Sequence, residues 1–472
     1  MITKTLVADA LTPVRAYAAL READPEGASF LLESVVGGER WGRYSILGYR
    51  PRYEAILDRT GWKLRGEGPL PDFASAPGDP VAAVEPLFRR PAPAASQAER
   101  FARAHVGYLA WDIVHLIDKV PPGSDATWKK HFVALARFVG GATVVVFDAL
   151  AQTVTIAAER QEDVDRALAD MQRAPKLADI AIPDRARIPG DVTTDLSDDE
   201  FKERVLRAKE YIAAGDAFQI VLARTFSVPR AGRDAFDVYR AMRLINPSPY
   251  MYFLDLPPAP GETDRLRIAG ASPETMVRLE GGTMTVRPIA GTRPRGKTPE
   301  EDLALEKELL SDPKEVAEHV MLIDLGRNDV GRVSTIGSVE LVRRMEIDRY
   351  SHVMHIVSEV RGKVAPETPP LEVVRAAFPA GTLSGAPKVR AMQIIRELEA
   401  RPRGIYGGAI GYIADDADLD FAIAIRTMVD HGDRFEVTAG AGIVEASDPQ
   451  AEADETRNKA RGVLCAIEAA RG

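Results

Sequence analysis

Two pairs of glutamates, each with its members three residues apart, have clear potential for chemistry in this sequence. Each pair follows an Asp-Pro dipeptide, Asp312-Pro313 or Asp448-Pro449, which is typical of the first residues of a helix. Residues three apart share one helix face, so two such helices could bring four carboxylates together. Oxygen ligands of this kind suit Mg²⁺, whereas an ordinary capped and solvated helix is the alternative explanation. The pairs are Glu315 with Glu318 and Glu452 with Glu455.

Three further segments could bind an anion. Residues 381–388, which include the hydroxyl of Thr382, precede a run typical of a helix, and the N-terminus of a helix favours negative charge. Backbone N–H groups of Gly440-Ala441-Gly442 could approach a carboxylate closely because glycine has no side chain. Arg426 follows the apolar run 421–425, and its counter-anion is either a ligand or an internal carboxylate. Ordinary loops and turns are the alternative for the two glycine-containing segments.

The elements that must position these residues fall into two regions. Residues 1–172 suggest an α+β arrangement, with short strands predicted at 143–147 and 153–156. A break at about 173–195, rich in proline and charge, predicts a boundary. Beyond it, Ser197-Asp-Asp-Glu200 has the pattern of a capping box, and apolar residues at helical spacing follow until Gly215. We therefore expect one domain over 1–172 and a second over 196–472.

The composition is that of a soluble globular protein and excludes several classes. A net charge of −9 argues against general affinity for nucleic acid, which needs a basic face. Cys465 is the only cysteine and lies in an apolar run, so we expect a buried thiol and a reducing, cytoplasmic location. The first residues lack the apolar core of a signal peptide, and no stretch of about 18 apolar residues predicts a membrane span.

Six ordered blocks of sequence resemble the chorismate-utilising enzymes. The resemblance covers roughly residues 200–465 of this chain. The blocks are Gly270-Ala-Ser-Pro-Glu274, Pro288-Ile-Ala-Gly-Thr-Arg-Pro-Arg-Gly296, Ala317-Glu-His319 with Ile323-Asp-Leu-Gly-Arg-Asn-Asp329, residues 381–388, Gly440-Ala-Gly-Ile443 and Glu455-Thr-Arg-Asn-Lys459. The resemblance implies an α+β fold in which two large antiparallel sheets form a sandwich with helices between and around them. The N-terminal region is similar to the companion domain of anthranilate synthase large subunits, through Leu31-Leu-Glu-Ser34 and Arg43-Tyr-Ser45.

The resemblance also implies a site. Glu318 and Glu455 match ligands of a Mg²⁺ ion that holds the ring carboxylate of chorismate, and the other two glutamates of the pairs match direct or water-mediated ligands. Glu274 matches the general acid that protonates the departing C4 hydroxyl, since hydroxide is a poor leaving group. His355 matches a histidine tied to the elimination of pyruvate. The matching positions expected to bind substrate, or to lie beside it, are Gly291, Thr292, Tyr406, Arg426, Gly440, Ala441, Gly442, Thr382 and Lys459.

Two positions distinguish among members of the family. Members that add water at C2 of chorismate carry a lysine at the position of Gln219, and glutamine cannot activate water as a lysine of lowered pKa can. One type of aminodeoxychorismate synthase carries a nucleophilic lysine at the position of Ala290. With Gln219 and Thr382 in the catalytic set, we therefore expect Mg²⁺-dependent addition of ammonia at C2 and loss of pyruvate to give anthranilate, which starts tryptophan biosynthesis. An aminodeoxychorismate synthase is the alternative, because some of those enzymes lack that lysine.

The resemblance extends to regulation. Leu31-Leu-Glu-Ser34 and Asn246-Pro-Ser-Pro-Tyr-Met251 match segments that form a pocket for the feedback inhibitor L-tryptophan, with ordinary core turns as the alternative. The residues carried over to this pocket are Ser34, Pro249, Tyr250 and Met251. The N-terminal region would then be a regulatory domain. A non-catalytic tryptophan sensor is a further alternative, but such a protein would be expected to have lost some of the catalytic and metal-binding residues.

The source of ammonia is expected to be another chain. A Cys-His-Glu glutaminase needs a reactive cysteine, and the single cysteine, Cys465, is in an apolar run. We therefore expect a separate glutamine amidotransferase subunit, assembled with this chain in a hetero-oligomer such as a heterotetramer.

Overall fold

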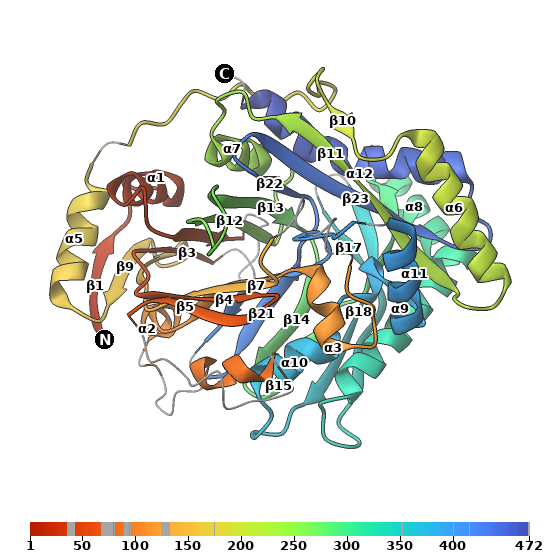
Figure 1. Ribbon diagram of the computed structural model, residues 1–472, viewed down its shortest axis with the longest axis horizontal. Helices are drawn as coiled ribbons and strands as arrows, with labels where there is room; N and C mark the ends of the chain where they lie inside the picture. The colour runs from red at the N-terminus through yellow and green to blue at the C-terminus, as the bar shows by residue number, and fades with distance from the viewer. Residues whose placement is uncertain are drawn as a thin grey trace.

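Two large antiparallel sheets form the centre of the molecule in the computed structural model (Figure 1). The structure describes residues 1–34, 43–67, 79, 81–88, 94, 96–123, 133–173, 175–350, 353–399, 401–414 and 416–470. The larger sheet has 12 strands and the smaller has 11. This architecture confirms the α+β sandwich expected from the sequence.

In both sheets the strands from the early part of the chain lie together on one side, and those from the later part lie together on the other. Across the larger sheet the order is β1 (Ile2–Val7), β9 (Thr153–Ala158), β8 (Thr143–Asp148), β3 (Tyr44–Tyr49), β2 (Ser29–Glu33), β12 (Tyr250–Leu256), β13 (Leu266–Ser272), β22 (Thr427–Asp430), β23 (Arg434–Ile443), β11 (Gln219–Pro229) and β10 (Thr193–Thr194), with β19 (Gly385–Ala386) paired to β11. Across the smaller sheet it is β16 (Ile289–Pro294), β18 (Val353–Lys363), β15 (Thr283–Val286), β14 (Thr275–Glu280), β21 (Leu419–Ile423), β20 (Ala409–Ile413), β6 (His105–Leu109), β7 (Ala136–Gly140), β4 (Tyr53–Asp58) and β5 (Gly61–Gly66), with β17 (Glu340–Arg349) paired to β18.

Helices cover the sheets on both sides. They are α1 (Pro13–Ala23), α2 (Gln97–Ala102), α3 (Val114–Ile117), α5 (Gln161–Met171), α6 (Asp198–Ala213), α7 (Ala235–Ile245), α8 (Pro299–Ser311), α9 (Pro313–Gly331), α10 (Pro370–Ala377), α11 (Lys388–Glu399) and α12 (Pro449–Ala469), with short 3-10 helices η2 (Ala82–Phe88), η3 (Trp111–Ile113) and η4 (Gly381–Leu383). Figure 1 shows α6, α8, α9 and α11 gathered on one side of the molecule. None of the helices in the described ranges is long and apolar enough to span a bilayer.

The alternation of side chains along the strands builds two packed layers. In β12, Met251 and Phe253 belong to a core cluster shared with α1, α5, α7 and α12, whereas Tyr252 and Leu254 belong to a cluster shared with β6 and α2. Successive residues of a strand point to opposite faces, so one strand serves both layers. Cys465 is buried in the first of these clusters, as predicted.

The two regions that the sequence divides at about 173–195 share both sheets. Strand β2 pairs with β12, placing Leu31 opposite Phe253, and β6 pairs with β20, placing Gly107 opposite Gly411. A buried ion-pair network adds to this join. The carboxylate of Asp255 in β12 accepts from Arg21 Nε of α1 at 2.8 Å. The chain before the predicted boundary is therefore integral to the body that carries the rest, and its regulatory role stays a prediction.

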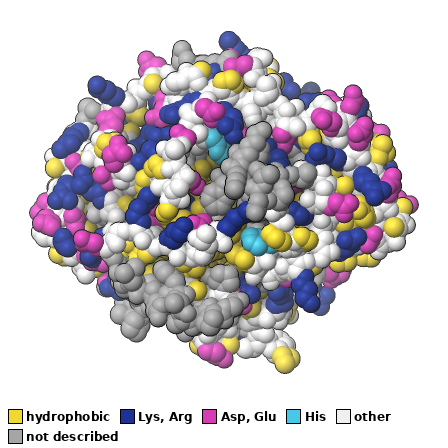
Figure 2. All heavy atoms as spheres, viewed as in Figure 1, with side chains coloured by type: hydrophobic (Ala, Val, Ile, Leu, Met, Phe, Trp, Pro, Cys, Tyr) yellow, Lys and Arg dark blue, Asp and Glu magenta, His cyan; other side chains and the backbone are white. Residues whose placement is uncertain are grey.

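The helix starts that the sequence signals predict are present. Ser197 and Glu200 form a complete capping box on α6. Asp312 caps α9 by accepting from the backbone N–H groups of Lys314 and Glu315, and Asp448 caps α12 by accepting from Ala451. On the face shown in Figure 2, basic and acidic side chains are interspersed.

Candidate active site

A cavity of about 520 Å³ brings together almost every residue that the sequence singled out. Its walls come from both sheets and from the two helices that carry the glutamate pairs. The predicted catalytic, substrate-binding and metal-binding residues that line it are Gln219, Glu274, Gly291, Thr292, Glu315, Glu318, His355, Thr382, Tyr406, Arg426, Gly440, Gly442, Glu452, Glu455 and Lys459.

The exception is Ala441, whose neighbours on β23 face the cavity. The side chain of Ala441 is 0% exposed and belongs to the hydrophobic core on the other face of the strand. A Cβ atom at Gly440 would lie 2.6 Å from the Tyr406 hydroxyl, and one at Gly442 would lie 2.8 Å from Gln219 Nε2. Both distances are shorter than a carbon can tolerate, so glycine lets the polar groups approach β23 closely.

Glu274 lies in the short turn between β13 and β14, where its side chain is removed from water. The residue is 9% exposed, and the hydroxyl of Thr382 donates to its Oε1 at 3.1 Å. Burial raises the pKa of Glu274 from 4.5 to about 7, against the lowering effects of Thr382, Lys459 and Arg426. Such a carboxyl can hold a proton near neutral pH and give it to a leaving group.

His355 projects from β18 beside β16. Its Nδ1 lies 3.1 Å from the carbonyl oxygen of Gly291 and 3.0 Å from the hydroxyl oxygen of Thr292. A carbonyl oxygen only accepts, so the proton is on Nδ1 and the lone pair is on Nε2. Burial lowers the pKa of His355, and the charge of Arg426 lowers it further. The ring is therefore neutral and able to accept a proton at Nε2.

Two of the cationic side chains that line the cavity, Arg426 and Lys459, give it a place for an anion. The guanidinium of Arg426 has no hydrogen-bonded or ion-paired carboxylate within the described part of the chain, and burial lowers its pKa. Lys459 of α12 donates to the carbonyl oxygen of Gly440 at 3.0 Å and pairs with Glu455 at 2.6 Å. A partly buried guanidinium without a counter-ion is unfavourable, so an anionic ligand would be stabilised beside Arg426.

The four glutamates of α9 and α12 form an acidic wall of the same cavity. Burial raises the pKa of Glu318, and the charge of Glu315 raises it further. Burial likewise raises the pKa of Glu452, with a further increase from Glu455. Bringing like charges together out of water is unfavourable unless a cation neutralises them.

The acidic wall fits Mg²⁺ as an open site. Among the residues that the structure describes, no three His, Cys, Asp or Glu side chains are close enough to form a ready-made metal centre. Mg²⁺ is usually held by one or two carboxylates with waters and substrate oxygens in its other positions. Carboxylates from two helices that line one cavity, together with space for a ligand, match that requirement.

Gln219 connects the acidic wall to the larger sheet. Its Nε2 donates to Glu318 Oε1 at 3.1 Å, which fixes the orientation of the amide. Its Oε1 is buried and has no hydrogen-bond partner among the described residues. The side chain can therefore orient a ligand that donates a hydrogen bond but cannot deprotonate one.

Sequence reasoning missed three polar residues of the cavity, Lys314, Tyr350 and Thr438. Lys314 directly precedes Glu315 on the first turn of α9, so its place beside a predicted metal ligand could have indicated that it lines the cavity. Tyr350 follows β17, and its ring lies 5.7 Å from that of His355 at an interplanar angle of 64°. No sequence pattern indicated this contact, because it depends on the pairing of β17 with β18.

A second cavity of about 410 Å³ is lined by all four residues predicted to bind tryptophan, Ser34, Pro249, Tyr250 and Met251. Its other walls include apolar side chains such as Ile46 and Phe101. The charged groups that line it are Glu33, Arg43, Arg278 and Asp420. The hydroxyl oxygen of Ser34 is buried without a hydrogen-bond partner in the described ranges. An apolar pocket with both signs of charge suits a zwitterionic ligand that has an apolar side chain.

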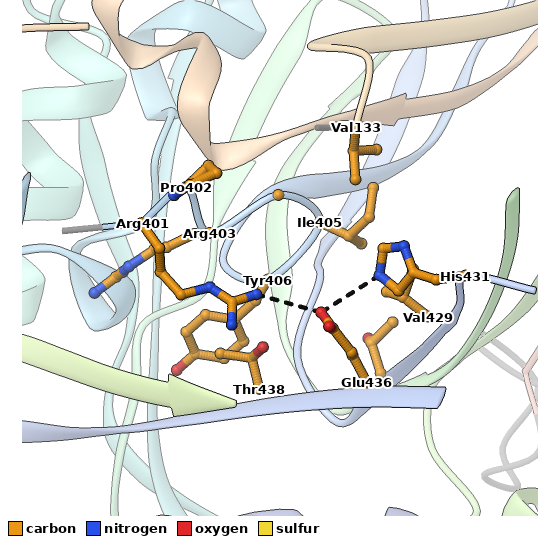
Figure 3. Close-up of a pocket in the computed structure, with 12 residues that line it drawn as sticks. Val133, Arg401, Pro402, Arg403, Ile405, Tyr406, Val429, His431, Glu436 and Thr438 are labelled. Atoms are coloured by element: carbon orange, nitrogen blue, oxygen red, sulfur yellow. Dashed lines mark hydrogen bonds and ion pairs between the residues drawn. The ribbon is translucent and has the colours of Figure 1, made fainter. Parts of the chain in front are cut away.

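A much smaller cavity of about 30 Å³, shown in Figure 3, shares Tyr406 and Thr438 with the large one. Three of its side chains form ion pairs with one another: Glu436 lies 3.3 Å from Arg401 and 3.4 Å from His431. This volume has room for about one or two water molecules. The small cavity is therefore too small for a substrate. It lies behind the wall of the large cavity that contains Tyr406.

Comparison with known proteins places these features in a family context. The family model of the chorismate binding enzymes matches residues 58–464. The anthranilate synthase component 1 of Streptomyces coelicolor is 43% identical, covering 97% of this chain and 87% of the relative. The component 1 of Thermus thermophilus is 42% identical, covering 99% and 97%. The crystal structure of anthranilate synthase component I from Streptococcus pneumoniae is 33% identical, with a TM-score of 0.77 and coverage of 97% and 99%.

The burial of Glu274 predicts a pH-dependent cost to stability. A carboxyl whose pKa rises from 4.5 unfolded to about 7 folded binds more protons in the folded state. Stability is therefore lost as pH rises from 4.5 to 7. Glu274→Gln keeps the acceptor for Thr382 and removes this cost. The measurement is the unfolding free energy of the variant minus that of the wild type, obtained by urea denaturation at each pH. We expect this difference to increase by roughly 2–3 kcal/mol between pH 5 and pH 8. A difference that does not change with pH would contradict the assigned burial.

Proposed function

Because the chain belongs to the chorismate binding enzyme family, we propose that it is component I of an anthranilate synthase, which converts chorismate and ammonia into anthranilate and pyruvate at the start of tryptophan biosynthesis. The observation that carries the proposal is the arrangement of Glu274, a buried acid, with His355, a neutral base, in one cavity. The relatives named anthranilate synthase component 1 support the choice within the family.

Substrate binding follows from the charges of the cavity. Chorismate is a dianion, and the Arg426 guanidinium is positioned to pair with one of its carboxylates. Mg²⁺ held by Glu318 and Glu455, with Glu315 and Glu452 as direct or water-mediated ligands, would neutralise the ring carboxylate. The backbone of Gly440 and Gly442 lies on the same wall and lets the substrate approach β23.

In the first step, the nitrogen of ammonia forms a bond to C2, the two ring double bonds shift toward C4, and the bond between C4 and its hydroxyl oxygen breaks. The added nitrogen then loses its extra proton to solvent. Glu274 gives its proton to the departing oxygen, which leaves as water. Ammonia carries its own lone pair and needs no base to attack. The amide oxygen of Gln219 can accept one of its N–H groups, which leaves the lone pair directed away from the amide.

In the second step, the proton on C2 is removed and the bond between C3 and the enolpyruvyl oxygen breaks. The electron pair of the C2–H bond completes the aromatic ring, and the released enol takes up a proton to become pyruvate. The Nε2 atom of His355 is the candidate acceptor, because Gly291 fixes the proton on Nδ1. A neutral histidine of lowered pKa releases the proton again at neutral pH.

Two partners belong to the proposal. A separate amidotransferase subunit would supply ammonia, since Cys465 is buried in the hydrophobic core, where burial raises its pKa and makes it a poor nucleophile. L-Tryptophan would bind the second cavity as the end-product inhibitor, supported by the pocket that Ser34, Pro249, Tyr250 and Met251 line together.

The purified chain should form anthranilate from chorismate, Mg²⁺ and high ammonium chloride, and should form none when glutamine replaces ammonium. The reason is a complete reaction cavity on a chain without an accessible thiol nucleophile among its described residues. Chromatography of the products against standards decides the outcome. Aminodeoxychorismate or isochorismate as the main product would refute the assignment.

Glu318→Gln and Glu455→Gln should each reduce the Mg²⁺-dependent rate by about 10²-fold or more, because each change removes both a charge and a ligand. Each substitution should also raise the Mg²⁺ concentration that gives half-maximal activity. Asp324→Asn is a matched control on α9, since the Asp324 side chain is 67% exposed and pairs only with its helix neighbour Arg327 among the described ion pairs. Near wild-type Mg²⁺ dependence in both glutamine variants would show that these glutamates do not bind the metal and are ordinary solvated helix residues.

A further inference from the structure

One hydrogen-bonded contact joins the second cavity to the candidate active site. The hydroxyl of Tyr250, which lines the second cavity, donates to Asp420 Oδ1 at 2.9 Å and lies 2.9 Å from Thr275 Oγ1. A phenol has one hydrogen, and a carboxylate only accepts, so Thr275 donates to Tyr250. Thr275 is the residue directly after Glu274. A residue that lines the second cavity therefore contacts the immediate neighbour of Glu274, the proposed acid of the active site.

The backbone around this contact is held from two sides. Tyr250 pairs with Ser272 across β12 and β13, and the Ser272 hydroxyl oxygen lies 3.3 Å from the backbone nitrogen of Glu274. On the other side, Arg278 holds Asp420 through two bonds of 2.7 and 3.0 Å. A displacement of the Tyr250 ring would therefore act on the turn that carries Glu274.

Glu274 has space to respond to such a displacement. A small cavity of about 40 Å³ is lined by Glu274, Thr275 and Thr382. The pairing of β14 with β21 also shifts register between Thr275 and Val277, so the ladder is interrupted beside the turn. Close-packed interiors resist movement, and a void next to an interrupted ladder permits a second position of the carboxyl.

The second cavity also offers a physical cause for the displacement. Asp420 lines this cavity and accepts from both Tyr250 and Arg278. The ammonium group of an amino acid bound there would compete for the same carboxylate. A Tyr250 ring displaced from Asp420 in this way also withdraws the acceptor of the Thr275 hydroxyl, so the bond that Thr275 donates is lost.

Resting on the function proposed above, we propose that Thr275 is a positioning residue that makes the orientation of Glu274 depend on whether an amino acid occupies the second cavity. The bond from Thr275 to Tyr250 holds Glu274 in the orientation in which its carboxyl accepts the hydrogen bond from Thr382. A ligand that binds better when this bond is broken stabilises the low-activity arrangement, as feedback inhibition requires.

The test uses the full chain and compares four variants for tryptophan binding by calorimetry and for anthranilate formation with ammonium. Thr275→Val keeps the shape and removes the donor, and Thr275→Ser restores a hydroxyl. Tyr250→Phe removes the acceptor and is a second route to the same loss should Thr275→Val fold poorly. Ser34→Arg fills the second cavity and serves as the contrast, with loss of binding and inhibition together.

For Thr275→Val we expect a several-fold lower kcat with little change in the KM for chorismate, because an orientation of the acid matters in the transition state. We also expect tryptophan binding to persist while its inhibitory effect weakens about ten-fold. Thr275→Ser should restore both properties, and Tyr250→Phe should uncouple binding from inhibition in the same way.

Wild-type kcat and inhibition in both Thr275→Val and Tyr250→Phe would overturn the proposal. An equal loss in Thr275→Ser and Thr275→Val would also overturn it, because the hydroxyl would then have no part. A wild-type chain that makes anthranilate without binding tryptophan would refute the regulatory link while leaving the reaction standing. A wild-type chain that makes no anthranilate would refute the proposed function itself.

Discussion

The carboxyl of Glu274 is held out of water by the turn between β13 and β14, and the other charged groups of the cavity are arranged around that burial. Thr382, Lys459 and Arg426 each favour the charged form, yet the pKa stays at about 7 because burial outweighs them. A carboxyl that was solvated would be ionised and unable to act as an acid at neutral pH. The opposite case is His355, whose pKa burial lowers, so acid and base coexist uncharged in one cavity.

This arrangement requires both sheets to be built from the whole chain. Gln219 and Gly440 reach the cavity from the larger sheet, and His355 and Thr292 reach it from the smaller one. The pairing of β2 with β12 then places Ser34, at the end of β2, near Tyr250, at the start of β12. The cavity proposed for a regulatory ligand is thus separated from the proposed acid by only one pair of strands, so coupling between them would act over a short distance.

Local signals in the sequence predicted the helices that carry the glutamate pairs, because Asp312 and Asp448 satisfy backbone N–H groups of their own helices. The membership of the cavity followed from the family resemblance, and of the predicted catalytic, substrate-binding and metal-binding residues only Ala441 has its side chain elsewhere, on the core face of β23. Strand period alone predicts that Gly440 and Gly442 share a face that Ala441 does not.

Other features could not be predicted because they depend on tertiary pairing. Tyr350 contacts His355 only because β17 folds onto β18, and Tyr250 reaches Thr275 across 25 residues of sequence. The break at about 173–195 does mark a segment with little regular structure, since β10 is its only strand in the described part. Composition at that break carries no information about strand β2 pairing with β12, so the intermixing of the two regions was not visible.

The protonation state of Glu274 is the most direct test of this account. Carbon-13 NMR of the chain with labelled glutamate side-chain carboxyls, recorded from pH 4 to pH 9 beside the Glu274→Gln variant, isolates one resonance. The account predicts that the resonance missing from the variant titrates with a pKa of about 7. A titration near 4.5 would show a solvated carboxylate and contradict the assignment of Glu274 as the acid.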